Sequence, residues 1–189
     1  LTYMIGFEDD APTTKLSKEE AKLAATGKKS QVSELVEDDI FSPLAGDVLP
    51  LSEAEDAAFS EGLLGQGLVI QPTIGEIKAP FDGVVMTLFP TKHAIGLISE
   101  KGTELLIHIG IDTVELEGQH YEAFVTQGQA VKRGDKLITF DIAAIEAAGF
   151  NTQTPVIVTN SQTLSKIEMT DQLKVSTTDR LFTIGLANS

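Results

Sequence analysis

Short apolar runs, separated by glycine, proline and aspartate, make up most of the chain from Ile40 onward. Runs of this length with polar residues between them are typical of β-strands rather than helices. One short helix is expected at Ile142–Ala148, where Asp141 can cap the first turn and Gly149 can end the last one. Further strands are expected within residues 123–141 and at Pro155–Thr159, around Lys166, at Leu173–Ser176 and at Leu181–Ile184. The pattern predicts an all-β domain with short helical turns.

Two alternating runs flank the turn sequence Ser99–Gly102 in the middle of the chain, and each contains a histidine. A four-residue loop would place His93 directly opposite His108, and opposed residues have Cβ atoms about 4.5–5.5 Å apart on one face. A three-residue loop would pair His93 with Ile109 and send the histidines to opposite faces. The sequence permits both loops, and we favour the first. The four-residue loop predicts two solvent-accessible imidazoles that could both contact one small tetrahedral group.

A repeated motif is visible at residues 42–48 and 79–85, SPLAGDV and APFDGVV, which share the pattern small-Pro-x-x-Gly-x-Val. Proline fixes φ at a strand start or turn, and glycine permits the positive φ with which a chain folds back. The same device used twice predicts two related sheet halves packed face to face.

Composition and charge narrow the possible functions. The 189 residues suffice for one domain plus an appendage. Residues 1–39 contain too few apolar side chains to offset the cost of ordering, so we expect a flexible linker there and the folded domain over 40–189. The net charge of −14 argues against nucleic acid or an anionic membrane surface as partner and favours a basic one.

Several kinds of segment and site are missing from the sequence. Without cysteine there is no disulfide, no thiolate metal site and no cysteine nucleophile. There is no apolar run long enough to span a bilayer and no secretion signal, so a cytoplasmic domain is expected.

The stretch HIGIDTVELEG begins at His108, and a second histidine lies fifteen residues upstream in the sequence Thr91–His93. Together with SPLAGDVLPL, GQGLVIQP, APFDGVV and TPVIVTN, it resembles the glucose-type IIA domain of the bacterial sugar phosphotransferase system. The resemblance runs from about Ile40 to the C-terminus. It implies an antiparallel β-sandwich built from a duplicated motif. It also implies a phosphocarrier, which takes a phosphoryl group from the protein HPr and passes it to a cysteine of a IIB domain during sugar uptake.

Leu1–Asp10 resembles the end of the membrane-embedded IIC part of sucrose-, trehalose- or β-glucoside-type permeases. This similarity implies that the domain is tethered to the inner face of the cell membrane and that the IIB domain belongs to the same polypeptide.

The resemblance assigns a role to each residue of the histidine pair and its neighbours. It makes His108 the nucleophile, through Nε2, and implies that the Gly110 carbonyl holds its Nδ1–H. It has His93 donate to a phosphoryl oxygen and Thr91 accept from the other nitrogen of His93. Asp112 is expected either to bind a basic residue of the donor or to be a turn residue only. His120 is assigned no function.

Residues 53–65 contain apolar side chains in an irregular segment. They can form a short helix or 3₁₀ turn packed under the sheet, or an exposed patch that docks partners. Because the resemblance places this segment on the rim of the active site, we favour docking, by a patch that comprises Asp56, Phe59, Leu64, Phe89 and Leu106.

Other interpretations of the pair are a core histidine bonded to a carbonyl, a zinc peptidase and a regulatory module. Zinc peptidases of related fold use a His-x-His pair, but Leu106 and Gly110 occupy the corresponding positions. Two histidines alone hold zinc weakly, so no obligatory metal or cofactor is expected, and zinc only with a ligand from a partner. A regulatory IIA-like module, attached to a sugar transporter and without onward transfer, is the remaining alternative.

Overall fold

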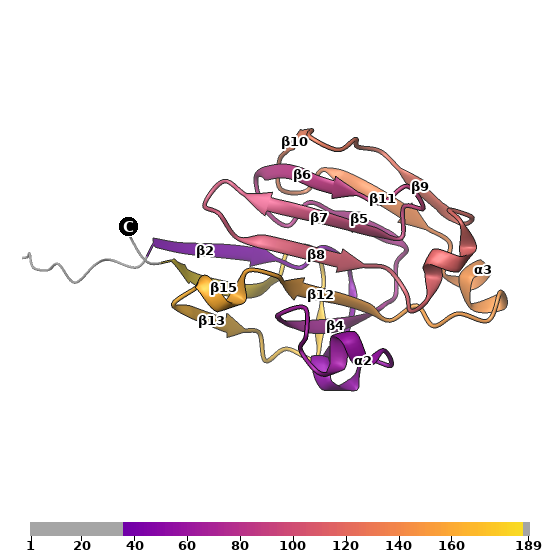
Figure 1. Ribbon diagram of the computed structural model, residues 1–189, viewed down its shortest axis with the longest axis horizontal. Coiled ribbons are helices and arrows are strands. Elements are labelled where there is room, and N and C mark those ends of the chain that lie inside the picture. The colour runs from indigo at the N-terminus through magenta and orange to yellow at the C-terminus, as the bar shows by residue number, and fades with distance from the viewer. Residues whose placement is uncertain (1–35, 187–189) are drawn as a thin grey trace, which may run out of the picture. The chain divides into compact units, whose positions relative to one another are not determined.

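Antiparallel strands in three sheets form the part of the chain that this computed structural model describes, residues 36–186 (Figure 1). The eight-stranded sheet has the order β10 (Ala130–Val131), β6 (Gly83–Leu88), β7 (Ala94–Ser99), β8 (Glu104–His108), β12 (Thr154–Val158), β4 (Gln66–Pro72), β3 (Gly46–Pro50), β14 (Lys174–Val175). The two three-stranded sheets are β5 (Glu76–Lys78), β11 (Lys136–Phe140), β9 (Tyr121–Ala123), and β13 (Lys166–Met169), β15 (Arg180–Leu186), β2 (Val36–Phe41).

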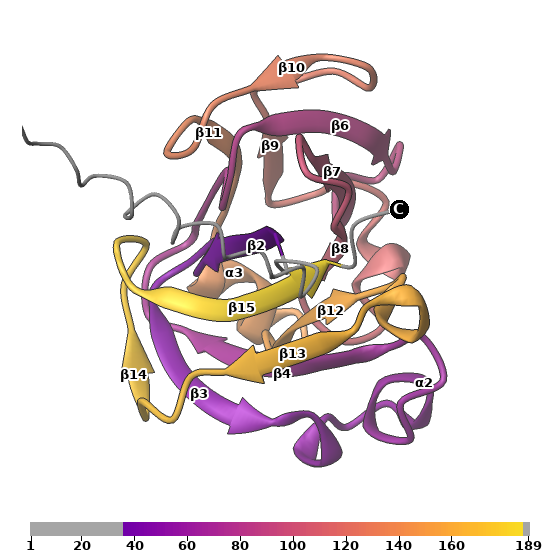
Figure 2. The same cartoon turned by 90° about the vertical axis from the view of Figure 1, so that its left-hand side faces the viewer.

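Helical structure in residues 36–186 is limited to short pieces: α2 (Ala57–Ser60), α3 (Ile142–Ala147), and the 3₁₀ turns η2 (Leu51–Glu53), η3 (Thr113–Leu116) and η4 (Ser161–Thr163). Asp141 caps α3 as predicted, because its carboxylate accepts from the Ala144 N–H, and Gly149 follows the helix with φ 95°. Figure 2 shows the eight-stranded sheet curving from β10 and β6 to β4 and β3, with β2 and β15 between its ends. The all-β prediction is confirmed.

The first strand begins earlier than the sequence suggested. Strand β2 starts at Val36, and Asp38 within it is 5% exposed and accepts a hydrogen bond from the Ser99 hydroxyl. The predicted domain boundary after residue 39 is therefore wrong, and residues 36–39 belong to the fold. Their acidic composition concealed the strand, because a buried carboxylate here is satisfied by a partner distant in sequence. The linker predicted for residues 1–35 lies outside the described residues.

The repeated proline motif is a structural repeat. The Phe41 N–H donates to the Pro80 carbonyl (3.1 Å), and the Lys78 N–H donates to the Pro43 carbonyl (2.8 Å). Each donor lies two residues before the proline of its own motif, so the two copies bind each other reciprocally. This exchange of equivalent hydrogen bonds is the behaviour of two halves related by an approximate two-fold axis.

The glycines of these motifs are required for a different reason from the predicted one, which was a positive φ. Gly46 and Gly83 are not among the residues with positive φ. A Cβ at Gly46 would lie 2.1 Å from the Gln71 carbonyl oxygen, and one at Gly83 would lie 2.1 Å from that of Ile98. Both glycines are needed because a neighbouring strand's backbone approaches too closely for any side chain.

A second part of the repeat escaped the sequence analysis. Residues 131–137 and 175–181, VKRGDKL and VSTTDRL, share the pattern Val-x-x-x-Asp-basic-Leu. Val131 pairs with Gly83 and Val175 pairs with Gly46. The duplicated unit therefore also includes the short strands β10 and β14, which pair with the glycines of the two proline motifs.

The eight-stranded sheet is covered on both faces around β8, β12 and β4. Leu105 and Ile107 of β8 belong to the main core, whereas Leu106 packs against a smaller cluster formed by Ala54, Phe59, Val69, Ile111 and Ile157. Successive side chains of a strand point to opposite faces, so the smaller cluster lies on the other side of the sheet from the main core. It joins α2 to the face that also carries His108.

Candidate active site

His93 and His108 meet at one end of the β7–β8 hairpin. Their ring centroids are 4.9 Å apart, and the ring planes make an angle of 81°. His108 is the last residue of β8, and His93 immediately precedes β7. The predicted convergence of the two imidazoles is confirmed.

The register that brings them together is the one we did not favour. Ala94 lies opposite His108, and Ser99 and Thr103 close a three-residue loop through a backbone hydrogen bond of 2.9 Å. Gly102 ends this loop with φ 102°, a conformation that three-residue hairpin loops require and that glycine adopts without strain. The four-residue loop of the prediction is therefore wrong.

The histidines share a face because His93 lies outside the regular pleat. Its carbonyl accepts from the Ile109 N–H (2.6 Å), as the three-residue loop requires. The preceding residue, Lys92, has φ 62°, in the left-handed region that lysine rarely adopts. This turn interrupts the alternation of side chains before β7 begins. The alternation rule, which would place the two rings on opposite faces of the sheet, therefore does not apply at His93.

His108 has its tautomer fixed by the backbone. Its Nδ1 lies 2.8 Å from the Gly110 carbonyl oxygen, which can only accept, so Nδ1 carries the proton and Nε2 keeps its lone pair. The Phe59 ring lies 4.9 Å from the half-buried His108 ring. Burial lowers the pKa of His108, opposed by the Gly110 hydrogen bond and by the charges of Asp56 and Asp112. A lowered pKa favours the neutral ring, whose Nε2 lone pair is free.

His93 is more deeply buried than expected. It is 3% exposed, and the Phe89 ring contacts it edge-on at 5.4 Å. Burial, together with the neighbouring His108, lowers the pKa of His93 to about 4. Its Nδ1 lies 2.7 Å from the Thr91 hydroxyl, the predicted partner. The prediction that both rings are open to solvent is therefore wrong for His93, because Phe89 and His108 cover it.

The segment predicted to dock partners is a short helix with mixed exposure. Phe59 is 4% exposed, so the prediction that it lies on an open patch is wrong: it packs under the sheet face beside His108. Leu64 and Phe89 are 41% and 37% exposed. Phe89 and the half-buried Leu106 line one mostly apolar hollow of about 200 Å³. Asp56 caps α2 by accepting from the Ala58 N–H at 2.8 Å.

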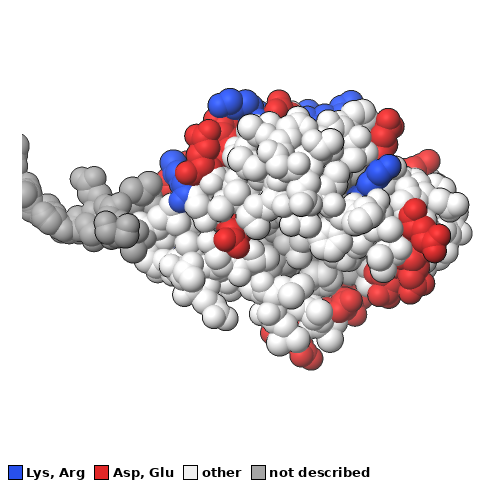
Figure 3. Space-filling view, turned by 45° about the horizontal axis from the view of Figure 1, so that its top comes forward, with Lys and Arg blue, Asp and Glu red and all other residues white. Residues whose placement is uncertain are grey.

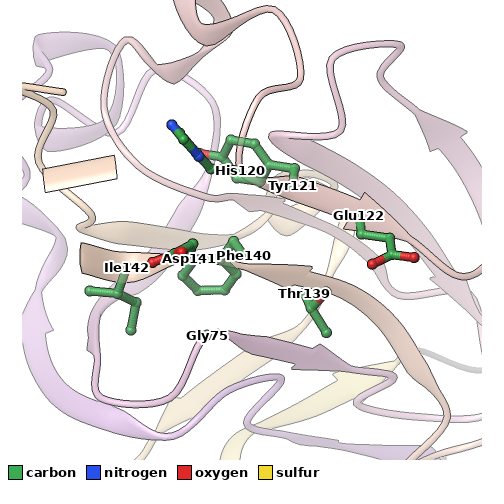
Figure 4. A pocket seen from close by; sticks show the side chains of 8 residues that line it. All are labelled: Gly75, His120, Tyr121, Glu122, Thr139, Phe140, Asp141 and Ile142. Atoms are coloured by element: carbon green, nitrogen blue, oxygen red, sulfur yellow. The ribbon is translucent and has the colours of Figure 1, made fainter. Parts of the chain in front are cut away.

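Two further residues of the sequence analysis lie in the segment after β8. Asp112 is exposed, has φ 61° and precedes η3 without a capping hydrogen bond from its side chain. His120, with φ 77°, lines a separate hollow of about 630 Å³ together with Tyr121 and Asp141 (Figure 4). Neither His93 nor His108 lines that hollow, so His120 does not join the pair.

Gln153 is a site residue that the sequence analysis missed. Its carbonyl accepts from the Gly110 N–H at 3.0 Å, so it binds the peptide unit next to the one that orients His108. Its only signal in the sequence is a polar residue directly before an apolar strand, which is too common to be informative.

Within residues 36–186 no group of three or more His, Cys, Asp and Glu side chains is arranged to hold a metal ion. No helix in that part of the chain is long and apolar enough to cross a membrane.

Burial of a neutral histidine makes stability depend on pH. The pKa of His93 is about 4 in the folded chain, against the ordinary value of 6.5 that applies once the chain unfolds, so the unfolded chain binds more protons between these values. The contribution of neutral, buried His93 to the free energy of unfolding is complete above pH 6.5 and is lost as the pH falls toward 4. We expect the free energy of unfolding of the wild type, relative to His93→Gln, to fall by about 2 kcal/mol from pH 7.5 to 4.5. Urea unfolding at both pH values measures it, and parallel pH profiles would contradict it.

Comparison with known proteins identifies the family. A sequence model of the phosphoenolpyruvate-dependent sugar phosphotransferase system, EIIA 1, matches residues 38–164. A PTS system beta-glucoside-specific EIIBCA component of Halalkalibacterium halodurans is 46% identical over 156 residues, covering 82% of this chain and 23% of that protein. The Bacillus subtilis protein of the same name is 44% identical over 163 residues, covering 86% and 25%. The chain thus spans about a quarter of the length of these relatives.

A solved structure extends the comparison to the fold. Glucose permease IIA from Mycoplasma capricolum matches with a TM-score of 0.72 and 37% identity, over 78% of this chain and 96% of that one. The region that the family's sequence model matches contains both histidines and the strands that position them. The chain therefore belongs to the EIIA 1 family of the phosphoenolpyruvate-dependent sugar phosphotransferase system and is a phosphotransferase domain of that system.

Proposed function

We propose that Nε2 of His108 accepts the phosphoryl group from phosphorylated HPr and passes it to a cysteine of a IIB domain. The observation that carries this proposal is the hydrogen bond between His108 Nδ1 and the Gly110 carbonyl, which leaves the Nε2 lone pair free. The donor's N–P bond breaks as the bond from phosphorus to Nε2 forms, and no proton needs to leave His108. In the second step this N–P bond breaks and an S–P bond forms on the acceptor's thiolate.

His93 donates to the phosphoryl oxygens in this proposal, and Thr91 orients the His93 ring. A neutral imidazole has one N–H, and donation from Nε2 of His93 requires its Nδ1 to accept. The Thr91 hydroxyl, at 2.7 Å, then donates to Nδ1, which reverses the direction expected from the sequence. A donor fixed in a buried site stabilises the charge on the equatorial oxygens of a loose phosphoryl-transfer transition state.

Partner docking is proposed for the surface around the pair. Leu64, Phe89 and Leu106 supply apolar area, and Asp56 and Asp112 supply negative charge near His108. In the face shown in Figure 3, acidic atoms lie toward both ends of the described part, and much of the area between them is without charged atoms. A basic rim around an apolar centre on HPr would complement such a surface. Phe59 supports this surface from below and does not form it.

The arrangement of the relatives supports a membrane-tethered parent. We propose that the chain is the A part of a β-glucoside-type permease, with IIB and IIC parts in the same polypeptide, and that it works on the cytoplasmic side of the membrane. The relatives are named for β-glucosides, and not for sucrose or trehalose. A flexible tether raises the effective concentration of domains to about the millimolar range. No cofactor is required, and zinc would bind the two histidines only with a further ligand from a partner.

Reconstitution of the transfer chain tests this proposal. The domain is incubated with phosphoenolpyruvate, Enzyme I and HPr, and the IIB domain of a β-glucoside permease is then added. We expect acid-labile phosphate on His108, followed by its loss as phosphocysteine forms. Phosphorylated His108 without onward transfer to IIB would instead favour the regulatory module, and an unphosphorylated domain would overturn the proposal.

A further inference from the structure

The Gln153 side chain binds a neighbouring segment with both of its polar atoms. Its Nε2 donates to the Glu53 carbonyl (3.1 Å), and its Oε1 accepts from the Glu55 N–H (3.0 Å). Gln153 is 7% exposed and directly precedes β12. The amide thus binds the C=O of one residue and the N–H of the residue two positions later. These are the two hydrogen bonds that the backbone of a paired strand would make. The segment is therefore held in place although no strand pairs with it at this point.

The backbone of the same residue reaches the phosphorylation site. The Gln153 carbonyl accepts from the Gly110 N–H (3.0 Å), and the Gly110 carbonyl accepts from His108 Nδ1 (2.8 Å). Gln153 thus binds the residue that fixes the tautomer of His108 and, through its side chain, a segment far away in sequence.

The clamped segment leads directly into the groups that surround His108. Asp56 follows Glu55 and caps α2, and its negative charge opposes the lowering of the His108 pKa by burial. Phe59, within α2, packs on the His108 ring with centroids 4.9 Å apart. A shift of this segment would therefore change both the packing and the electrostatic environment of the nucleophile.

We infer that Gln153 is a positioning residue for phosphoryl transfer, which locks the Glu53–Phe59 segment and the Gly110 peptide into one arrangement around His108. The inference rests on the proposed function of His108. Without the clamp, α2 can move relative to the sheet, and the ring spends less time in the orientation that in-line transfer requires. A misplacement of about 1 Å at a reacting group can lower a rate by about 10²-fold.

Asn160 provides a matched control at the other end of β12. Its Oδ1 accepts from the Glu104 N–H (3.1 Å), and its Nδ2 donates to the Gly102 carbonyl (2.9 Å). This clamp has the same form, but it binds the turn of the β7–β8 hairpin, at the end opposite the histidines (Figure 1). Loss of either clamp removes two hydrogen bonds of the same kind.

The test compares Gln153→Leu with Asn160→Leu in the whole chain, at a temperature where circular dichroism shows both to be folded. Rates of phosphorylation are measured over a range of phosphorylated HPr concentrations. We expect Gln153→Leu to lower kcat at least about tenfold and Asn160→Leu to change it less than about twofold. NMR of the imidazole nitrogens should show a changed pKa of His108 in Gln153→Leu only, because the Phe59 ring that buries His108 and the Asp56 charge are no longer held in place.

Equal losses in the two variants, or an unchanged kcat and His108 pKa in Gln153→Leu, would reduce Gln153 to a structural residue. If Gln153→Leu does not fold, Gln153→Met carries the test, because it keeps the length of the side chain without adding a charge and loses both hydrogen bonds to residues 53–55. Failure of the wild type to accept phosphate would overturn the proposed function. An active wild type with no difference between the variants would overturn this inference alone.

Discussion

Replacing His108 with glutamine is expected to abolish acceptance of the phosphoryl group. Glutamine preserves much of the side chain's length and polarity but has no lone pair on a ring nitrogen, so no N–P bond can form. The half-buried position of His108 and its hydrogen bond to Gly110 favour its Nε2 as the reactive atom of the pair in the proposed function. We expect the initial rate with phosphorylated HPr to fall by at least about 10³-fold.

Radiolabelled phosphoenolpyruvate with Enzyme I and HPr measures this rate. His120→Gln serves as the control, because that histidine lines a separate hollow, and it should accept phosphate as the wild type does. Incorporation of acid-labile label into His108→Gln at the wild-type rate would show that another residue is the nucleophile. Unfolding in urea checks that the substitution leaves the domain folded.

Replacing His93 with glutamine is expected to separate the two half-reactions. Nε2 of His108 stays available, so acceptance from phosphorylated HPr should stay within about threefold of the wild type. Onward transfer to the IIB cysteine should fall about 10²- to 10³-fold, because a fixed donor to the phosphoryl oxygens is lost at a buried position. The 3% exposure of His93 favours this supporting role, since a donor protein cannot reach it as readily as His108.

Single-turnover experiments distinguish the steps: the isolated phosphorylated variant is mixed with IIB, and loss of label from His108 is followed. A variant that accepts nothing, while His108→Gln still accepts, would reverse the two roles. A variant that transfers onward at the wild-type rate would remove His93 from the mechanism and leave it as a packing residue beneath the nucleophile.

The sequence by itself determined the strands, the repeated motif and the identity of the pair. Alternation along β8 placed Leu105 and Ile107 in the core and His108 on the opposite face, because side chains of an extended strand must alternate. The contact of His108 with Gly110 was implied by the family resemblance and that of His93 with Thr91 by their positions two residues apart, and both contacts span only two residues. Local geometry decides such contacts, so a sequence can specify them.

Contacts between distant segments were decided only by the tertiary structure. The close approach of Gln71 to Gly46, the burial of Phe59 beneath His108 and the clamp from Gln153 to Glu53 each join residues from separate parts of the chain. No periodicity within a segment reports which backbone will pass nearby. For the same reason, the acidic residues of β2 have the sequence pattern of a linker although they form a strand.

In the β7–β8 hairpin the two histidines converge as predicted, although the strands pair in a different register from the predicted one. Alternation determined that His108 faces the smaller cluster, but whether His93 joins it depended on Lys92, whose left-handed backbone interrupts the pleat. Lysine gives no signal for that conformation, which is stable here only because the surrounding structure imposes it. Local sequence thus determined which residues form the site, and packing across the fold determined how they face each other.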